Sequence, residues 1–132
     1  DGTTKVANVN LYATSMNTCL TVDVSGASIS GSDILGQTWI NTCPLRAIVA
    51  TVMTTWSPTS RNLRSIVVNG TTVWTGNVTS GTTADISDVD IPGSTTYPVN
   101  RYRFSGGISG KCFTHTMTMW DGTTVNVGSY CP

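Results

Sequence analysis

The sequence contains no glutamate, a single histidine and few charged residues of any kind. Charged residues make up 11% of the 132 positions, and seven Asp balance seven Lys plus Arg, so the formal net charge is zero. A neutral chain without a basic run is a poor candidate for binding nucleic acid or an anionic membrane. Because acid–base catalysis needs several positioned titratable groups, and glycoside hydrolysis typically uses a carboxylate pair that includes Glu, we expect no enzyme activity and no cofactor.

Long apolar runs are also missing. The longest is Ala-Ile-Val-Ala at positions 47–50, far shorter than the roughly 20 residues of a membrane-spanning helix, so we expect no membrane span. The helix formers Ala, Glu, Lys and Leu are absent, scarce or scattered, whereas Thr is the commonest residue and is accompanied by Val, Ile, Trp and Tyr. The latter residues favour strands, so the composition predicts one all-β domain.

Turn signals divide the chain into short segments with strand-like alternation. Residues 45–56 are apolar on both faces over most of their length, which predicts the central strand, while the Gly- and Ser-rich residues 25–33 predict a loop. The expected strands are 5–13, 20–24, 37–43, 45–56, 63–68, 71–74, 85–91, 101–104 and the two arms of a hairpin within 111–131. This pattern predicts an antiparallel β-sandwich, Ig-like or jelly-roll-like, rather than a closed barrel.

The strongest local signal is the pair Asp121-Gly122, which lies between two β-rich runs and predicts a hairpin. If these two residues form the turn, paired positions have numbers that sum to 243, and Cys112 lies opposite Cys131. The register set by the turn is then the same as the register that a disulfide between these two cysteines requires. A two-residue turn places this pair at a hydrogen-bonded position, where side chains lie further apart, so a small bulge is expected to adjust the geometry.

Elimination pairs the other two cysteines, Cys19 and Cys43, and gives two disulfides. Four cysteines without a Cys-x-x-Cys spacing favour an oxidising compartment over a zinc or thioredoxin-type site. The chain begins at Asp1 rather than Met, which is typical of the processed end of a secreted protein. Asn69 and Asn77 each begin an Asn-x-Thr acceptor motif for N-glycans, although such triplets also arise by chance in a Thr-rich chain. We therefore expect an extracellular protein, with glycosylation as an open possibility.

His115 is the only histidine, and Phe113, Met117 and Met119 share its strand face. A metal or catalytic site needs several converging groups, and all four thiols are expected to be in disulfides. No Gly-x-Ser-x-Gly turn is present to indicate a nucleophile. We therefore predict a structural role for His115.

Asp85, Asp88 and Asp90 form the only acidic cluster. Their carboxylates, with nearby Thr and carbonyl oxygens, are ligands of the kind that Ca²⁺ takes. The alternative, which we favour, is that Asp88 and Asp90 face solvent while Val89 and Ile91 face the core, because charged residues are seldom buried without a partner.

The four tryptophans, Trp39, Trp56, Trp74 and Trp120, are candidates for stacking on sugar rings. Trp56 and Trp120 lie at predicted strand ends beside turns, where an aromatic side chain is often half exposed. Packing in the core or at its rim is the more frequent use of such residues.

Several stretches share one pattern of short Thr-rich strands joined by tight turns. They are Thr55-Trp56-Ser57-Pro58, residues 63–76 with Asn69-Gly70 at the turn, residues 86–91, Tyr102-x-Phe104-Ser105 and Ile108-Ser109-Gly110-Lys111. Over roughly residues 45–125 the chain resembles the β-domains of archaeal pilus, thread and bundling-fibre subunits. The resemblance implies a cell-surface filament subunit, often glycosylated. The type IV pilins have a long apolar N-terminal helix that this sequence lacks, so the resemblance implies the helix-free fibres, whose subunits join by donor-strand complementation.

The N-terminal segment shows strand-like alternation of apolar and polar residues, and this observation does not depend on the resemblance. Its apolar members are Ala7, Val9, Leu11 and Ala13, with Asn8 and Asn10 between them. A donor strand must be an alternating segment at a free terminus. Because Cys131 holds the C-terminal end and Cys19 anchors the chain only from that point on, residues 1–13 are the candidate donor strand and residues 14–132 the sandwich domain. Extended, the donor spans about 43 Å at 3.3 Å per residue. The alternative is an ordinary first strand of the chain's own sandwich.

These features predict a structural protein, a subunit of an extracellular cell-surface filament that polymerises head to tail. Its partners would be copies of itself, with surfaces or neighbouring fibres as further contacts in adhesion. The alternative is a secreted carbohydrate-binding or adhesive β-sandwich module.

Overall fold

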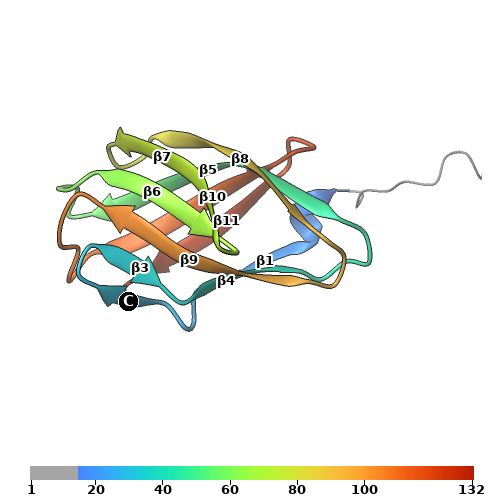
Figure 1. Ribbon diagram of the computed structural model, residues 1–132, viewed down its shortest axis with the longest axis horizontal. Coiled ribbons are helices and arrows are strands. Elements are labelled where there is room, and N and C mark those ends of the chain that lie inside the picture. Colours follow the sequence, from blue (N-terminus) through green and yellow to red (C-terminus); the bar gives the residue numbers. More distant parts are fainter. Residues whose placement is uncertain (1–14) are drawn as a thin grey trace, which may run out of the picture.

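The computed structural model describes residues 15–132, which form two antiparallel β-sheets packed face to face (Figure 1). A single turn of 3-10 helix, η2 (Met16–Thr18), precedes the first strand. The strands are β1 (Leu20–Asp23), β2 (Ser28–Ser30), β3 (Asp33–Leu35), β4 (Gln37–Asn41), β5 (Ala47–Ser57), β6 (Leu63–Val68), β7 (Thr71–Val78), β8 (Thr83–Ile91), β9 (Thr96–Phe104), β10 (Cys112–Met119) and β11 (Thr124–Tyr130). The described residues contain no α-helix. The predicted fold, an all-β antiparallel sandwich with two disulfides, is confirmed.

The larger sheet has seven strands and is organised around β9. One edge of β9 pairs first with β4 and then with β3, and the other edge pairs with β6. β1, β2 and β7 extend this sheet outward from β4, β3 and β6. The smaller sheet has the order β11-β10-β5-β8. Because β7 lies beside β8, β11 lies on the opposite side of the sandwich, the side of β1 and β2.

The predicted central strand is confirmed as β5, which lies between β10 and β8. Its partner β10 shows why these sequences form strands. Phe113, His115, Met117 and Met119 are buried and alternate with half-buried threonines and Cys112, because successive side chains of a strand point to opposite faces. One face of β10 therefore contributes a continuous row to the core.

The prediction of a loop at residues 25–33 is wrong. This segment contains β2 and the start of β3, which form a hairpin with Ile29 opposite Ile34. Gly31, at φ 60°, lies in its turn. The Gly and Ser content predicted a loop, but composition indicates a loop only statistically. The hairpin forms because Ile29 and Ile34 pack against the core. β7 and β9 are also longer than predicted, since β7 continues beyond residue 74 to Val78 and β9 begins at Thr96.

The Asn69-Gly70 turn is confirmed. Val68 pairs with Thr71, so the loop has two residues. Both have positive φ, 49° for Asn69 and 79° for Gly70, as a type I′ turn requires. Asn and Gly adopt this backbone region most readily, so the local sequence specifies the hairpin.

The register predicted for the C-terminal hairpin is correct at one end only. Thr118 pairs with Thr124, and the Met119 N–H donates to the Thr123 carbonyl at 2.8 Å, so the loop has three residues rather than two. Gly122 at φ 86° provides its left-handed residue, the arrangement of a type I turn with a bulge. A second bulge after Phe113 restores the predicted register, with Phe113 opposite Tyr130. The extra loop residue is therefore compensated before the strands reach the disulfide.

Candidate functional site

Both predicted disulfides are present. Cys112–Cys131 joins the open ends of the C-terminal hairpin, and Cys19–Cys43 joins the residue before β1 to the loop after β4. The described residues therefore contain no cysteine with a free thiol. The bridges fit an oxidising compartment, and they fix the last described strand and the first described segment to the sandwich.

The smaller sheet ends at β11, and this edge is open. Within residues 15–132, the backbone of β11 forms a ladder with β10 and with no other strand. Its sequence, Thr-Val-Asn-Val-Gly-Ser-Tyr, contains no charged residue and no proline. Such an edge presents unpaired N–H and C=O groups that can pair with a further strand.

The core is only partly covered along this edge. Six side chains pack against the core yet remain half-buried: Val22, Ala27, Ile29, Val125, Val127 and Tyr130. They belong to β1, β2, the turn between them and β11, which are edge strands of the two sheets, and we call them the β11 seam. The opposite side has fewer such side chains, Trp74, Val78 and Tyr97. The β11 seam therefore has more half-buried apolar side chains for an added strand to cover than the opposite side.

The described chain enters the sandwich beside this edge. The Asn17 N–H donates to Thr123 Oγ1 at 3.0 Å, and the Met16 N–H donates to Asp121 Oδ2 at 2.8 Å. From Asn17 back to Met16, these contacts move from Thr123 to Asp121, toward the tip of the β10–β11 hairpin and away from β11. Burial raises the pKa of Asp121, but hydrogen bonds from Thr123 and the Met16 backbone outweigh it and lower the pKa below its ordinary value.

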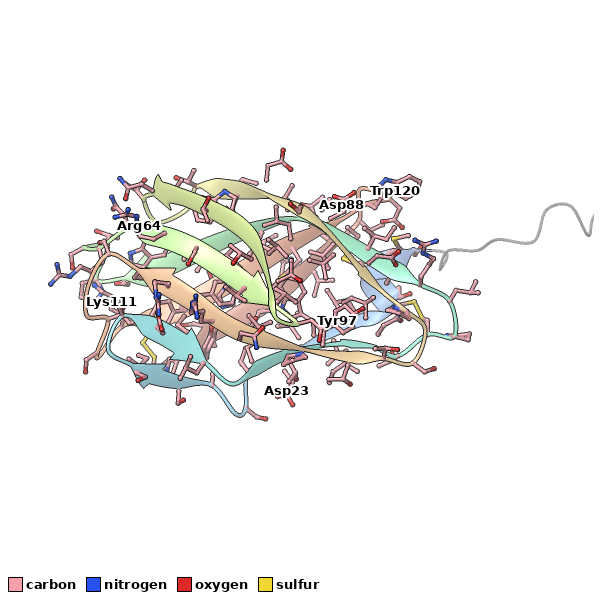
Figure 2. The ribbon with its side chains drawn as sticks, viewed as in Figure 1. Asp23, Arg64, Asp88, Tyr97, Lys111 and Trp120 are labelled. Atoms are coloured by element: carbon pink, nitrogen blue, oxygen red, sulfur yellow. A yellow bond between two sulfur atoms is a disulfide. The ribbon has the colours of Figure 1, made fainter. Side chains whose placement is uncertain are left out.

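The predicted donor residues Ala7, Val9, Leu11 and Ala13 lie outside the described residues. Met16, in contrast, is 1% exposed and is part of the core. The described chain is thus anchored from Met16 onward, at the end of the sandwich where Trp120 lies. Lys111 lies at the opposite end (Figure 2).

His115 occupies a buried polar network that the sequence did not indicate. Its Nδ1 lies 2.9 Å from Thr54 Oγ1, and its Nε2 is hydrogen-bonded to the Tyr130 hydroxyl. Gln37 Nε2 lies 3.3 Å from the same Nε2, and the Tyr102 ring stacks on the imidazole at 4.7 Å. Desolvation lowers the His115 pKa to about 3, so the imidazole is neutral at physiological pH.

Gln37 is the hub of this network. Its Oε1 accepts from Trp39 Nε1 at 3.1 Å and from the Tyr102 hydroxyl at 3.2 Å, and its Nε2 donates to the Tyr130 hydroxyl at 3.2 Å. Gln37 belongs to the larger sheet and Tyr130 to the smaller one, so the network joins the two layers. The available sequence signal was that Gln37, Trp39 and Asn41 share the buried parity of one strand.

A neutral His115 with its proton on Nδ1 satisfies all of these contacts. Nδ1–H then donates to Thr54, while Nε2 accepts from the Tyr130 hydroxyl and the Gln37 amide. We infer this tautomer from the network. Every ring nitrogen is used internally, which is the structural role predicted for this residue.

The three acidic residues do not converge. Asp90 forms an ion pair with Arg46, whereas Asp85 and Asp88 are exposed. Val89 and Ile91 are buried, the arrangement favoured from the sequence. Residues 15–132 contain no group of three His, Cys, Asp or Glu side chains that would hold a metal ion.

Asp85 and Asp88 instead border two openings along β7 and β8, which together we call the β7–β8 trough. The first, about 290 Å³, is lined by Thr72, Val73, Trp74, Thr75, Asp85 and Ser87. The second, about 190 Å³, is lined by Val68, Asn69, Thr71, Val73, Asp88, Val89, Asp90 and Tyr97. Both share Val73, so the openings are adjacent. Figure 2 shows Asp88 and Tyr97, which border the second opening, on different sheets.

The tryptophans have different environments. Trp39 is fully buried, and Trp56 is 2% exposed, with its indole N–H donating to the Arg61 carbonyl. The suggestion of a half-exposed Trp56 is therefore wrong, because the turn after β5 folds back over it. Trp120 is 57% exposed, and Trp74 is half-buried beside the trough.

Both N-glycan acceptor asparagines are exposed. Asn69 lies in the β6–β7 turn, and Asn77 lies on β7, where its Oδ1 accepts from Asn62 Nδ2 at 3.1 Å. Each side chain is sterically accessible, so the structure places no obstacle at either motif.

Comparison with known proteins adds no relative. No family model, no curated protein and no solved structure matches the chain. Among the described residues, no helix has the length and apolar character needed to cross a membrane.

Proposed function

We propose that this chain is the structural subunit of an extracellular cell-surface filament. In this assembly, residues 1–13 of one copy add as a strand to the sandwich of the next. The single observation that carries the proposal is the open edge of β11, whose half-buried apolar side chains lack a covering strand within residues 15–132. The sequence resemblance to archaeal fibre subunits points in the same direction.

The position of the first described residues supports donation to another copy. The Met16 and Asn17 amides donate to side chains at the tip of the β10–β11 hairpin, at the Trp120 end of the sandwich. A segment that extends from this end can be donated to a neighbouring copy, and a head-to-tail contact that does not close into a ring produces a filament.

The energetics of strand addition are favourable. An added strand gains main-chain hydrogen bonds, and its alternate side chains enter apolar positions. Burial of Val9 and Leu11 would contribute about 1.5–3 kcal/mol each. Each subunit would form two such joints, one as donor and one as acceptor. The disulfides and the exposed acceptor motifs at Asn69 and Asn77 support an extracellular, glycosylated assembly.

Electron microscopy of the full chain and of three variants tests this proposal. We expect filaments from the unmodified chain, and assembly-incompetent but folded monomers after deletion of residues 1–13. Leu11→Asp should block assembly, whereas Asn10→Asp, on the opposite face of the segment, should be tolerated. Filaments formed by the truncated chain would refute the proposal. A Leu11→Asp variant that melts at a lower temperature at every concentration would instead identify an intramolecular first strand.

The β7–β8 trough favours a second candidate function, carbohydrate binding. Trp74 offers a half-buried aromatic surface, and Asp85, Ser87, Thr72 and Thr75 offer hydroxyl and carboxylate groups at the same opening. A few convergent polar groups beside an aromatic side chain are typical of ligand sites. The exposed carboxylates would favour neutral over anionic sugars.

Calorimetric titration with neutral and with uronic-acid oligosaccharides tests the second candidate. Binding of neutral sugars that is lost in Asp85→Ala but kept in Asp23→Ala, a half-buried residue on β1 away from the trough, would support it. Equal binding by both variants, or no binding by the unmodified chain, would reject it.

A further inference from the structure

We propose that the outer edge of β11 in a second copy of this chain, together with the β11 seam, is the surface that receives the N-terminal strand. This inference rests on the proposed function and specifies the acceptor within it. The occupant is residues 5–13 of the neighbouring copy.

Five described strands lie at sheet edges, and they differ in how well they can accept a partner. β1 and β2 have four and three residues, too short to hold the nine-residue alternating segment. β8 is long enough, but it carries Asp85, Asp88 and Asp90 and has a register shift against β5 between Val49 and Thr51. Charges and bulges are features that protect an edge from pairing.

β7 is also a poor acceptor. Its register against β6 shifts at Gly76 and Asn77, and the Gly76 carbonyl already accepts a hydrogen bond from Arg64 Nε at 3.2 Å. The strand contains Asn77, an N-glycan acceptor, and it lies beside β8, which limits access to its edge. A bulky glycan on this strand would also block pairing.

β11 has fewer of these protections: it has one bulge against β10, between Val127 and Tyr130, whereas residues 124–127 pair with β10 without a shift. It has seven residues, no charge and no proline, and its backbone is paired on one side only. Its length corresponds to most of the segment 5–13. An uncharged edge of this length is a pairing site unless something covers it, which is the main reason to place the donor here.

The side chains of the two strands also match. Val125 and Val127 face the core and remain half-buried, while Asn126 between them is exposed. A paired donor strand would direct Val9 and Leu11 to the same inner face and its asparagines to solvent. Both strands would then present apolar residues inward and Asn outward.

The geometry of the joint gives the assembly a direction. The described chain begins at the hairpin tip beside Thr123, and β11 starts at Thr124 and runs toward the disulfide end. The donor of one copy therefore leaves from the Trp120 end, the same end at which its own acceptor strand begins. Each copy offers one donor and one acceptor, which is the condition for a linear polymer.

Edge-blocking variants of the full chain test the acceptor. Val127→Lys places a charge at the inner face of β11, where the lysine stem can cover apolar surface while its ammonium reaches solvent, so the monomer should still fold. We expect the concentration at half-assembly to rise about tenfold or more, equivalent to about 1.4 kcal/mol at 25 °C. Asn126→Lys, on the outer face of the same strand, and Val78→Lys, a half-buried site on β7, are the matched controls and should assemble normally. Melting curves of all three verify that the monomers are folded.

Photo-crosslinking then maps the contact. A photoreactive amino acid at position 10 of the full chain should form intermolecular links to peptides containing residues 124–130. Links to peptides of β7 or β8, with filaments present, would overturn this inference and leave the proposed function intact. Intramolecular links to residues 124–130 in a monomer would overturn both, and normal assembly of Val127→Lys would overturn the acceptor assignment.

Discussion

Acidification should destabilise this fold through His115. The folded protein lowers the imidazole pKa to about 3 because burial disfavours the cation, whereas an unfolded chain has a pKa of about 6.5. Between about pH 3 and pH 6.5 the imidazole is protonated in the unfolded state but neutral in the folded state. The free energy of unfolding therefore increases with pH across this window, and it decreases as the pH falls below about 6.5.

The magnitude follows from that difference. At pH 5 the unfolded chain gains about 2 kcal/mol from protonation of one histidine, relative to pH 7.5. Because pH 5 lies well above the pKa of His115 in the folded protein, this free-energy difference depends almost entirely on the pKa of the histidine in the unfolded chain. The slope should approach 1.4 kcal/mol per pH unit between about pH 6 and 4. Asp121, whose pKa is lowered in the fold, adds its own loss only at lower pH, near the ordinary range of Asp.

Urea unfolding monitored by tryptophan fluorescence measures this effect at a series of pH values. His115→Gln provides the control, because the amide can still bond Thr54 and Tyr130 but does not titrate. We expect this variant to be less stable at pH 7.5 by about 1–3 kcal/mol, the cost of disturbing a buried hydrogen-bond network, and to lose the steep slope. Equal slopes for the two proteins between pH 7.5 and 5 would refute the reasoning.

Three further predictions concern stability. Replacement of Cys19 and Cys43 together by Ala should lower the free energy of unfolding by about 3 kcal/mol, because the bridge closes a loop across a sequence separation of 24; a loss under about 1 kcal/mol in urea titrations would contradict this. Gln37→Leu should cost about 2–4 kcal/mol, because it orphans the Trp39 N–H and the Tyr102 hydroxyl, and a neutral effect would show that these groups find other partners. Asp33→Asn should lower stability by about 1 kcal/mol, because the ion pair to Arg103 has two hydrogen bonds of 2.9 Å but the Arg103 side chain is 47% exposed, so solvent screens it; a loss above about 2 kcal/mol in thermal melts would contradict this.

Local chemistry made much of the fold predictable. Asn69 and Gly70 specify a two-residue turn because both adopt positive φ at low cost. Alternation along β10 identified a buried face, and the apolar stretch in β5 identified an interior strand. The pairing of Cys112 with Cys131 followed from hairpin geometry and is correct, even though the loop has one residue more than predicted.

The errors share a cause. The β2–β3 hairpin was not predicted because its stability comes from the packing of Ile29 and Ile34 on the core rather than from strand-forming composition. Half exposure of Trp56 was left open beside core packing, because sequence does not reveal that the following turn covers it. In both cases a contact distant in sequence outweighed the local preference.

The sequence by itself determined the strand class, the tight turns, the disulfide pairing and the neutral, Glu-free chemistry, because each depends on residue type or short-range spacing. Only the tertiary structure decided which polar groups meet and which edge stays open. Gln37 and Tyr130, in different sheets, are joined by packing of the two layers, and β11 is an edge because no described strand follows it in the sheet. These properties depend on the order of strands in space, which long-range burial selects and which no local pattern encodes.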